Sequence, residues 1–470
     1  MYDKQLKGFL VAAGIFSLLG GLINQTAEAR TGKPNILFFF PDQFRYDWTS
    51  MNPVMPNLTP NLKKLANCGV YFSSAVCPSP LCAPSRACLA SGKNYEKCRV
   101  PSNKETYPID ETSFYKLLRD SAGYHVLGCG KFDLDKPGMN WGIDGKHKRE
   151  GLPSLLNVWG FTDGIDNAGK GDGQSANKEN IPEPYYAYLS EQGLIGKPMN
   201  DEAYADNWIA GNGLKLLRDV PVGKPWFLQI NFNGPHGPYD PTPAMLKDWD
   251  TVKFPSAADN PKDVNEIRKR YSAEVYNIDR WIKVYLDELQ KRGDLDNTII
   301  VFCSDHGDML GDHGFTGKEK PYQPSVGVPL IISGPGIKKR IINTKPVSTL
   351  DITATFLDFA KIKIPAEMDS KSLKSYLETG TGYNRKYVTS ALGQWRMVFD
   401  GQYKLIESKK DPIILYDLLK NPSETINIAD QNPEIVNRLS AFLPPWMETK
   451  SGDYENHKLL KTNHIQIIYT

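Results

Sequence analysis

Three things are scarce in this sequence: excess charge of one sign, closely spaced cysteines and long apolar runs. The 470 residues carry 56 Lys and Arg against 54 Asp and Glu, a net charge of +2. Such a balance gives no overall field that would attract nucleic acid or an acidic surface, so we expect no nucleic-acid partner. The seven cysteines include no Cys-x-x-Cys pair, which argues against a structural zinc site. The 40% of hydrophobic and 23% of charged residues are usual proportions for a globular protein.

The first 29 residues have the features of a secretion signal. Lys4 and Lys7 precede an apolar stretch over residues 8–23, and Ala27-Glu28-Ala29 is a small-x-small cleavage site. An uncleaved anchor is the alternative, but the stretch is short for a membrane span and no later stretch is longer. We therefore expect a signal peptide over residues 1–29. The mature protein would be periplasmic or secreted by a bacterium, with no stable membrane span. In such an oxidising compartment some of the cysteines could pair, and the odd count leaves Cys82 as the natural unpaired one.

Strand-like and helix-like segments alternate between residues 35 and 333. Residues 35–40 are continuously apolar, as expected of a parallel strand that is covered on both faces. A long helix is predicted over residues 264–292, where apolar residues recur at steps of three and four. These segments predict an α/β fold in which a large central, mostly parallel sheet lies between layers of helices. Further strands are predicted at residues 70–76, 124–127, 226–232, 298–303 and 328–333, and further helices at residues 59–68 and 112–121.

The pattern changes past about residue 370. Short strand-like segments follow one another there, and Asp400-Gly401 between two of them is a hairpin turn signal. We expect a catalytic domain over residues 30–375 and a smaller α+β domain over residues 376–470 that carries a short antiparallel sheet. Residues 138–210 show no clear period, and we expect them to form long loops over one end of the main sheet.

The segment Cys82-Ala83-Pro84-Ser85-Arg86 has the features of a nucleophile at the start of a helix. Pro84 suits the first helical position, because its missing N–H would be unpaired there anyway. The backbone N–H groups and the positive end of the helix dipole would then face an anion at residue 82. Arg86 adds a planar set of donors that suits a tetrahedral oxyanion. The alternative is a buried structural cysteine that precedes a short helix.

Two acidic pairs follow two predicted strands directly. Asp42-Gln43 comes after the first strand, and Asp305-His306 comes after the strand that ends at Cys303. Ligands of open α/β sheets bind at the carboxyl ends of strands, so both pairs and residue 82 would converge on one cation. Either pair alone would equally well be a helix cap or a turn.

The blocks around these residues resemble the type I sulfatases, a formylglycine-dependent family of the alkaline phosphatase-like superfamily. The blocks occur in the family's order and, with the C-terminal stretch, the resemblance covers nearly the whole mature chain. Departures are Gln43, where the family has Asp, and Asp133, where it usually has His. The matching blocks are Cys82 to Lys93, Gly130-Lys131-Phe132-Asp133, Asn233-Gly234-Pro235-His236, Ser304 to Gly314, and Gly317-Lys318 with Val328-Pro329-Leu330.

The resemblance implies that a separate maturation enzyme oxidises Cys82 to formylglycine (3-oxoalanine), whose hydrate attacks sulfur. It also implies a Ca²⁺ ion bound by Asp42, Gln43, residue 82, Asp305 and His306. Gln43 removes one negative charge from this set, and His306 is a softer ligand than calcium prefers. Mn²⁺ and Zn²⁺ therefore stay open as alternatives.

Catalytic roles are implied for five further residues. Arg86 would polarise the nucleophile, and Lys131 and Lys318 would hold the sulfate oxygens. His236 would protonate the departing alcohol. Asp133 would accept a hydrogen bond from the nucleophile and act as its base.

The function that the resemblance implies is an exported sulfatase that hydrolyses sulfate esters on a sulfated carbohydrate. One alternative is a phosphonate monoester or phosphodiester hydrolase, because an Asp-Gln start resembles that group of the same superfamily. A second is a non-catalytic protein that binds sulfated glycans. Aromatic residues in the predicted loops would either stack on sugar rings or pack the loops together, namely Trp141, Trp159, Tyr185, Tyr186, Tyr188 and Trp208.

Overall fold

The structure, a computed structural model, describes residues 32–144, 155–260, 262–383 and 385–447. The predicted signal peptide over residues 1–29 lies outside the described residues. The compact unit that carries the fold begins at Pro34. Among the described residues, none of the helices has both the length and the apolar character needed to cross a membrane.

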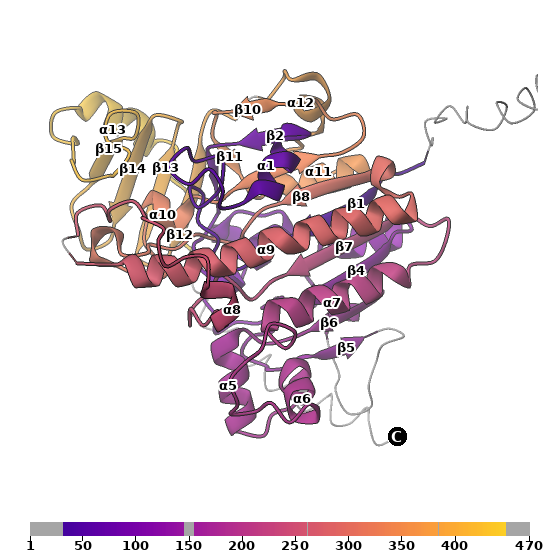
Figure 1. The fold of residues 1–470 in the computed structure, drawn as a ribbon. Coiled ribbons are helices and arrows are strands. Elements are labelled where there is room, and N and C mark those ends of the chain that lie inside the picture. The colour runs from indigo at the N-terminus through magenta and orange to yellow at the C-terminus, as the bar shows by residue number, and fades with distance from the viewer. Residues whose placement is uncertain (1–31, 145–154, 261, 384, 448–470) are drawn as a thin grey trace, which may run out of the picture. The chain divides into compact units, whose positions relative to one another are not determined.

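The unit is built around a nine-stranded sheet (Figure 1). Strands β9 and β5 run antiparallel to their neighbours, and all other strands of the sheet run in one direction. The predicted mostly parallel sheet is therefore confirmed. In sheet order the strands are β10 (Ile341–Asn343), β2 (Gly69–Phe72), β9 (Leu330–Ser333), β8 (Thr298–Phe302), β1 (Asn35–Phe39), β7 (Trp226–Asn231), β4 (His125–Gly130), β6 (Asp163–Asp166) and β5 (Gly142–Asp144).

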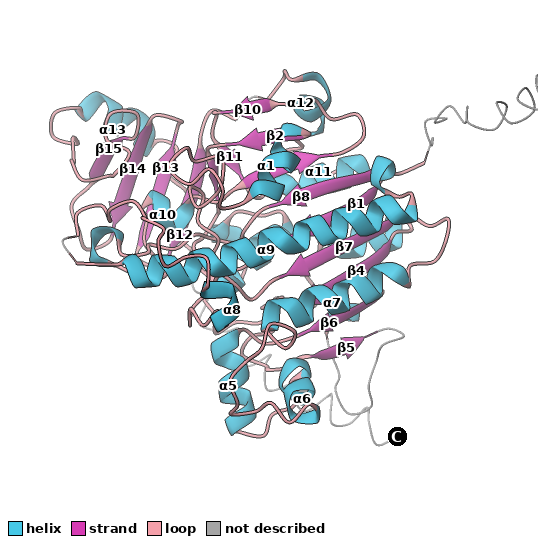
Figure 2. Cartoon of the chain, viewed as in Figure 1, coloured by secondary structure: helices cyan, strands magenta, loops and turns pink. Residues whose placement is uncertain are grey.

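Strand β1 lies at the centre and buries both of its faces, as its continuous apolar run predicts. Leu37 and Phe39 belong to a core that includes α1, α7 and α9, whereas Ile36 and Phe38 belong to a core that includes α2, α3 and α11. Helices thus cover both faces of the sheet (Figure 2). These helices are α1 (Pro60–Asn67), α7 (Ala205–Arg218) and α9 (Asn265–Arg292) on one face, and α2 (Cys82–Ser91), α3 (Phe114–Lys116) and α11 (Asp351–Phe359) on the other.

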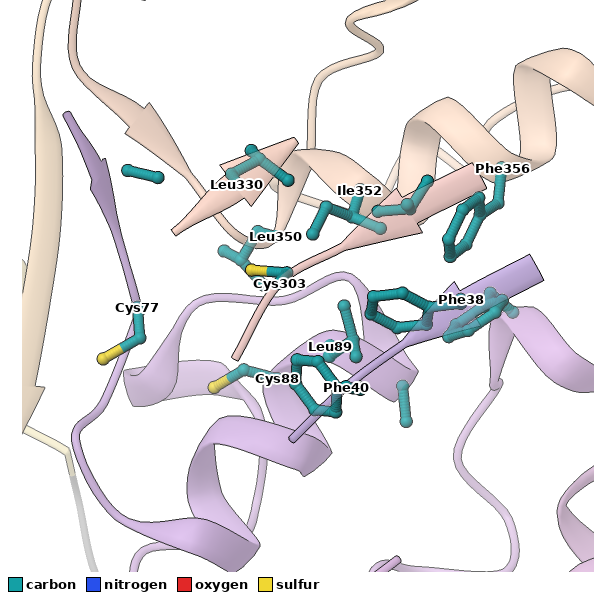
Figure 3. Close-up of a cluster of buried hydrophobic side chains, with 14 of the residues drawn as sticks. Phe38, Phe40, Cys77, Cys88, Leu89, Cys303, Leu330, Leu350, Ile352 and Phe356 are labelled. Atoms are coloured by element: carbon teal, nitrogen blue, oxygen red, sulfur yellow. The ribbon is translucent and has the colours of Figure 1, made fainter. Parts of the chain in front are cut away.

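The core behind α2 is rich in aromatic rings and thiols (Figure 3). Phe38 contacts Phe356 of α11 edge-on at 5.3 Å between ring centroids, a favoured geometry for aromatic pairs. Cys88 and Cys303 are fully buried in the same cluster. All seven cysteines are described and none is bonded to another, so no disulfide supports the fold in this structure.

A second, four-stranded antiparallel sheet follows, and a helix packs on it. The Asp400-Gly401 turn joins its second and third strands, as predicted; Gly401 has a φ of +101°, a conformation that favours glycine. The expected domain boundary at residue 375 stays a prediction. The elements are β12 (Val388–Leu392), β13 (Trp395–Phe399), β14 (Tyr403–Ser408), β15 (Ile414–Asp417) and α13 (Pro433–Ser440).

Two expectations about local structure are wrong, and a third is confirmed with a different helical geometry. Residues 138–210 are not mainly loops, because they supply strands β5 and β6 of the main sheet, several helices and the start of α7. The predicted strand over residues 70–76 divides into β2 and β3 (Ala75–Val76), and β3 pairs with β11 (Val347–Ser348) outside the main sheet. The helix expected over residues 112–121 begins as α3 and continues as a wider π-type turn. The remaining helices are α4 (Leu156–Trp159), α5 (Lys170–Lys178), α6 (Pro184–Glu191), α8 (Pro243–Leu246), α10 (Gln323–Val326) and α12 (Lys374–Thr379).

Candidate active site

The predicted site residues meet at the carboxyl ends of four neighbouring parallel strands, β8, β1, β7 and β4. Asp305 follows β8, Asp42 follows β1, His236 lies in the loop after β7, and Lys131 is the residue after β4. Neighbouring strands lie about 4.8 Å apart, so four strand ends deliver these side chains into one small volume. The structure thus brings both acidic pairs together at one edge of the sheet, and their convergence on one cation stays a prediction.

Cys82 lies in the first turn of α2, but the helix begins earlier than predicted. Its N-cap is Leu81 and its first residue is Cys82, so Pro84 occupies the third position instead of the first. The proline still fits, because the first-turn N–H groups have no partner within the helix. The N–H of Ala83 donates to Oδ1 of Asn103 at 3.1 Å, which satisfies one of these donors.

The Cys82 sulfur lies beside two lysine ammonium groups and an imidazole. Its Sγ lies 2.8 Å from Nζ of Lys318, 3.5 Å from Nζ of Lys131 and 3.4 Å from Nε2 of His306. Burial and the Asp42 carboxylate oppose ionisation, yet Lys131 and Lys318 hold the pKa of the Cys82 thiol well below its usual value. Position 82 is therefore an anion-stabilising site.

The two carboxylates of the site are joined by Arg86. Its guanidinium donates to Oδ2 of Asp305 from Nε at 3.0 Å and contacts Oδ2 of Asp42 from Nη2 at 3.4 Å. Nη1 donates to the carbonyl of Lys131 at 2.6 Å, and the Nζ of Lys131 forms an ion pair with Oδ2 of Asp42. Burial raises the pKa of Asp42, but the surrounding cations, Lys131 foremost, hold it well below its usual value. The Asp42 carboxylate is thus kept ionised away from water.

Four donor atoms form a group that fits a divalent cation. One atom each from Asp42, Cys82, Asp305 and His306 lies within 4.8 Å of the other three, and all four side chains are buried. The Nδ1–H of His306 faces the carbonyl of Gly307 at 3.0 Å, which leaves Nε2 free to bind a metal. The two carboxylates suit Ca²⁺ or Mn²⁺, whereas the imidazole and the Cys82 sulfur suit Zn²⁺; an oxygen in place of that sulfur would shift the set towards Ca²⁺ or Mn²⁺.

Gln43, the fifth predicted ligand, is held close to this group. Its backbone has a φ of +65° and its N–H donates to Oδ1 of Asp305 at 3.0 Å. Its side-chain amide donates from Nε2 to Oδ2 of Asp308 at 2.5 Å, which leaves the carbonyl oxygen as the only metal donor.

His236 and Lys318 lie beside each other at the sulfur. Nε2 of His236 is 2.7 Å from Nζ of Lys318, and Nδ1 of His236 faces the carbonyl of Gly237 at 2.5 Å. Nδ1 therefore donates to this carbonyl, and Nε2 is the ring nitrogen that faces the site.

Asp133 is buried beside Lys131 and has an unusual backbone conformation, with a φ of +51°. Its Oδ2 lies 3.2 Å from Nζ of Lys131 and 3.3 Å from Nζ of Lys136. Burial opposes the charge, but these two lysines hold the pKa of Asp133 below its usual value. Among the residues that the structure describes, none donates a hydrogen bond to Oδ1. Its expected role as the base stays a prediction.

The aromatic residues expected near the substrate divide into two groups. Trp141, Trp159 and Tyr185 are buried, so the packing interpretation is confirmed for these three. Tyr186 is half-buried and contacts the ring of Tyr185 edge-on. Tyr188 and Trp208 are half-buried and line a cavity of about 450 Å³ beside β5 and β6, together with Lys215.

Sequence reasoning missed several residues that support the site. Asp308 accepts hydrogen bonds from three loops, Tyr239 donates to it, and Asn103 binds the start of α2. Asp308 lies inside the matched block from Ser304 to Gly314, so the one available signal was an additional acid three residues after Asp305.

Comparisons with known proteins agree with this geometry. The fold is that of the alkaline phosphatase-like superfamily. The family model "Sulfatase" matches residues 34–362, and the model "N-sulphoglucosamine sulphohydrolase, C-terminal" matches residues 311–444. The chain belongs to the sulfatase family and is a sulfuric ester hydrolase.

Individual relatives share the fold over most of their length. The chain is 29% identical to a choline-sulfatase of Rhizobium meliloti over 86% of this chain and 83% of that protein. It is 27% identical to an arylsulfatase of Clostridium perfringens, over 91% of this chain and 98% of that protein. A solved structure in complex with its substrate D-glucosamine-2-N,6-O-disulfate has a TM-score of 0.72 at 22% identity, covering 87% of this chain and 96% of its own. The phosphonate monoester hydrolase of Agrobacterium radiobacter has the same fold, with a TM-score of 0.72 at 20% identity over 92% of this chain and 96% of its own.

Proposed function

We propose that the protein is an exported sulfatase that removes sulfate esters from a sulfated carbohydrate, with residue 82 as its nucleophile after oxidation to formylglycine. The observation that carries the proposal is the position of the Cys82 side chain. It lies at the start of a buried helix, within 3.5 Å of two lysine ammonium groups and among four candidate metal ligands. A structural cysteine would need none of these charges.

A divalent cation would be held by Asp42, Gln43, residue 82, Asp305 and His306. When bound, it would supply positive charge at residue 82, lower the pKa of a hydroxyl there and polarise a sulfate oxygen.

The chain's own side chains can carry out the remaining chemistry. Lys131 and Lys318 border the reactive atom and would stabilise the charge that develops on the sulfate oxygens. Nε2 of His236 would give its proton to the departing alcohol. Arg86 holds the two carboxylates in place through its bonds to both. The open Oδ1 of Asp133 would accept the nucleophile's hydrogen bond.

A carbohydrate substrate is proposed from the relatives. The chain is 28% identical to the N-acetylglucosamine-6-O-sulfatase of Bacteroides thetaiotaomicron over 75% of its length. Export is proposed from residues 1–29, and a maturation enzyme from the need to oxidise Cys82.

A phosphonate monoester or phosphodiester hydrolase is the second candidate. It is favoured by Gln43 in place of an acidic ligand and by the shared fold of the Agrobacterium radiobacter enzyme. The sulfatase model, which matches residues 34–362, favours the sulfate ester.

One experiment tests the nucleophile and the substrate together. Protein from its native host would be digested, and the mass of the peptide that contains residue 82 would be measured by mass spectrometry. The intact protein would then be assayed against an aryl sulfate, an aryl phosphonate and defined sulfated mono- and disaccharides. Formylglycine with faster turnover of the sulfates supports the proposal. An unmodified cysteine without turnover would favour a glycan-binding protein, and faster turnover of the phosphonate would favour the second candidate.

A further inference from the structure

Asp308 is a buried carboxylate at which three loops of the site meet. It follows His306 by two residues and its side chain is fully buried, yet it belongs neither to the expected ligands nor to the expected catalytic residues. Each of its two oxygens accepts two hydrogen bonds, so its acceptor capacity is well used.

The first oxygen, Oδ1, fixes the loop that carries Lys318. It accepts the backbone N–H of Leu310 at 2.9 Å and that of Gly317 at 2.9 Å. Gly317 immediately precedes Lys318, so the position of this lysine depends directly on the Asp308 carboxylate.

The second oxygen, Oδ2, links the other two loops. It accepts Nε2 of Gln43 at 2.5 Å and the hydroxyl of Tyr239 at 2.5 Å. Gln43 lies in the loop after β1, and Tyr239 lies three residues after His236 in the loop after β7. Tyr271 of α9 supports both, because its hydroxyl donates to the carbonyl of Gln43 at 2.6 Å and its ring contacts that of Tyr239 edge-on.

The chemistry of this contact decides which end of the Gln43 amide faces the metal ligands. An ionised carboxylate only accepts hydrogen bonds, so it binds the NH₂ end of the amide and rejects the carbonyl end. A cation needs the carbonyl oxygen. A carboxylate at position 43 would instead be repelled by the carboxylate of Asp308.

We propose that Asp308 is a positioning residue: it holds the amide of Gln43 with its carbonyl oxygen available to the cation and ties the loops of His236 and Lys318 to that arrangement. The inference rests on the metal site in the proposed function. It explains how a neutral residue can act as a ligand at position 43. The second negative charge is carried by Asp308, behind Gln43.

The test exchanges the donor and the acceptor of the hydrogen bond between Gln43 and Asp308. In Asp308→Asn the carboxylate loses one acceptor, so a donor of the new amide faces donors from the loops. Because removal of such supporting contacts costs about 10- to 100-fold in metal affinity, we expect the dissociation constant for Ca²⁺ to rise by that factor. In the double variant Gln43→Glu/Asp308→Asn, the new amide donates to the new carboxylate, so the contact is restored with its direction reversed. We expect its Ca²⁺ affinity to return to at least the wild-type value.

The measurement is isothermal titration of metal-stripped protein with CaCl₂, with MnCl₂ in parallel, together with the thermal unfolding midpoint of each metal-free variant. Asp312→Asn is the matched control. Asp312 is a buried carboxylate of the same segment that contacts Arg45, Arg268 and the N–H of Ala258 but not Gln43. It should lower the midpoint and leave the Ca²⁺ affinity at the wild-type value.

Two outcomes would overturn the inference. Asp308→Asn could bind Ca²⁺ as tightly as the wild type, or the double variant could bind no better than Asp308→Asn. Either result would leave the proposed function intact if the wild type binds the ion and cleaves sulfate esters. A wild type that binds neither ion would overturn the metal site itself.

Discussion

Nζ of Lys318 and Nε2 of His236 lie 2.7 Å apart, and the same Nζ lies 2.8 Å from the sulfur of Cys82. The lysine therefore contacts both the candidate nucleophile and the candidate proton donor. Cleavage of the ester bond and protonation of the leaving alcohol can therefore both take place beside the Lys318 ammonium group.

The contact between these residues makes a prediction about leaving groups. His236→Ala should lower kcat by about 10²- to 10⁴-fold for an alkyl or sugar sulfate, whose alcohol needs a proton as it departs. The loss should be much smaller for 4-nitrophenyl sulfate, whose phenolate departs unaided. Steady-state kinetics with both substrates checks this, and an equal loss on both would assign His236 to binding instead.

Substitution of Cys82 should separate the nucleophile from its neighbours. Cys82→Ala should abolish turnover, because no oxygen nucleophile can form there. Cys82→Ser has one hydroxyl where a formylglycine hydrate has two, so it should at most stop after one sulfate transfer. Turnover assays and intact-protein mass measure these outcomes. Cys88→Ala, a buried cysteine in the same helix, is the control and should keep its activity; near-normal activity of Cys82→Ala would refute the assignment.

The second sheet supports the Lys318 segment through a buried ion pair. Lys404 of β14 and Glu424 are paired at 2.6 Å, and Lys404 also donates to the carbonyl of Pro321 at 3.2 Å while Glu424 accepts the N–H of Gln323. Lys404→Met leaves a buried carboxylate unpaired, so the free energy of unfolding should fall by about 3–5 kcal/mol.

Lys404→Met/Glu424→Gln is the matched double variant. It removes the second charge and keeps an acceptor for Gln323, so denaturant unfolding should show a smaller loss than in Lys404→Met alone. A double variant that is less stable than the single one would mean that Glu424 does not depend on Lys404.

The buried carboxylate of Asp279, away from the active site, should make the free energy of unfolding depend on pH. Its carboxylate accepts the N–H groups of Asn61 and Leu62 at the start of α1, and burial raises its pKa from 3.8 to about 6. The folded state therefore binds a proton more tightly than the unfolded state. The proton on Asp279 therefore contributes to the free energy of unfolding. The contribution is fully present below pH 3.8, is lost as the pH rises through about 6 and amounts to about 3 kcal/mol.

Asp279→Asn removes that titration. The free energy of unfolding of the wild type minus that of the variant should therefore decrease between about pH 4 and pH 7. Denaturant titrations at several pH values in this range measure it, and a difference that grows with pH would contradict the assigned direction.

The sequence predicted the central strands well because burial on both faces leaves a continuous apolar run, as in β1, β7 and β8. It failed at the edge of the sheet. Strand β6 reads Asp163-Gly164-Ile165-Asp166 and has one apolar side chain, so periodicity gives no signal there. Helix α5 contains two glycines and several polar residues, and only its tertiary contacts stabilise it.

The proximity of Asp42, Asp305 and residue 82 was predictable because strand ends and the start of a helix have recognisable sequences. The supporting contacts were not, because they join residues far apart in the chain. The bond from Gln43 to Asp308 spans 265 positions, and nothing in either local sequence indicates the other residue.

Gly130, the last residue of β4, has a φ of +110°, and any β-carbon there would collide with the carbonyl of Asn231 on β7. In a combinatorial library aimed at new substrates, this position should tolerate no other amino acid. Every replacement would push β4 away from β7 and displace the Lys131 ammonium with it. Productive diversity would have to come from side chains above the strand ends that do not hold this backbone in place.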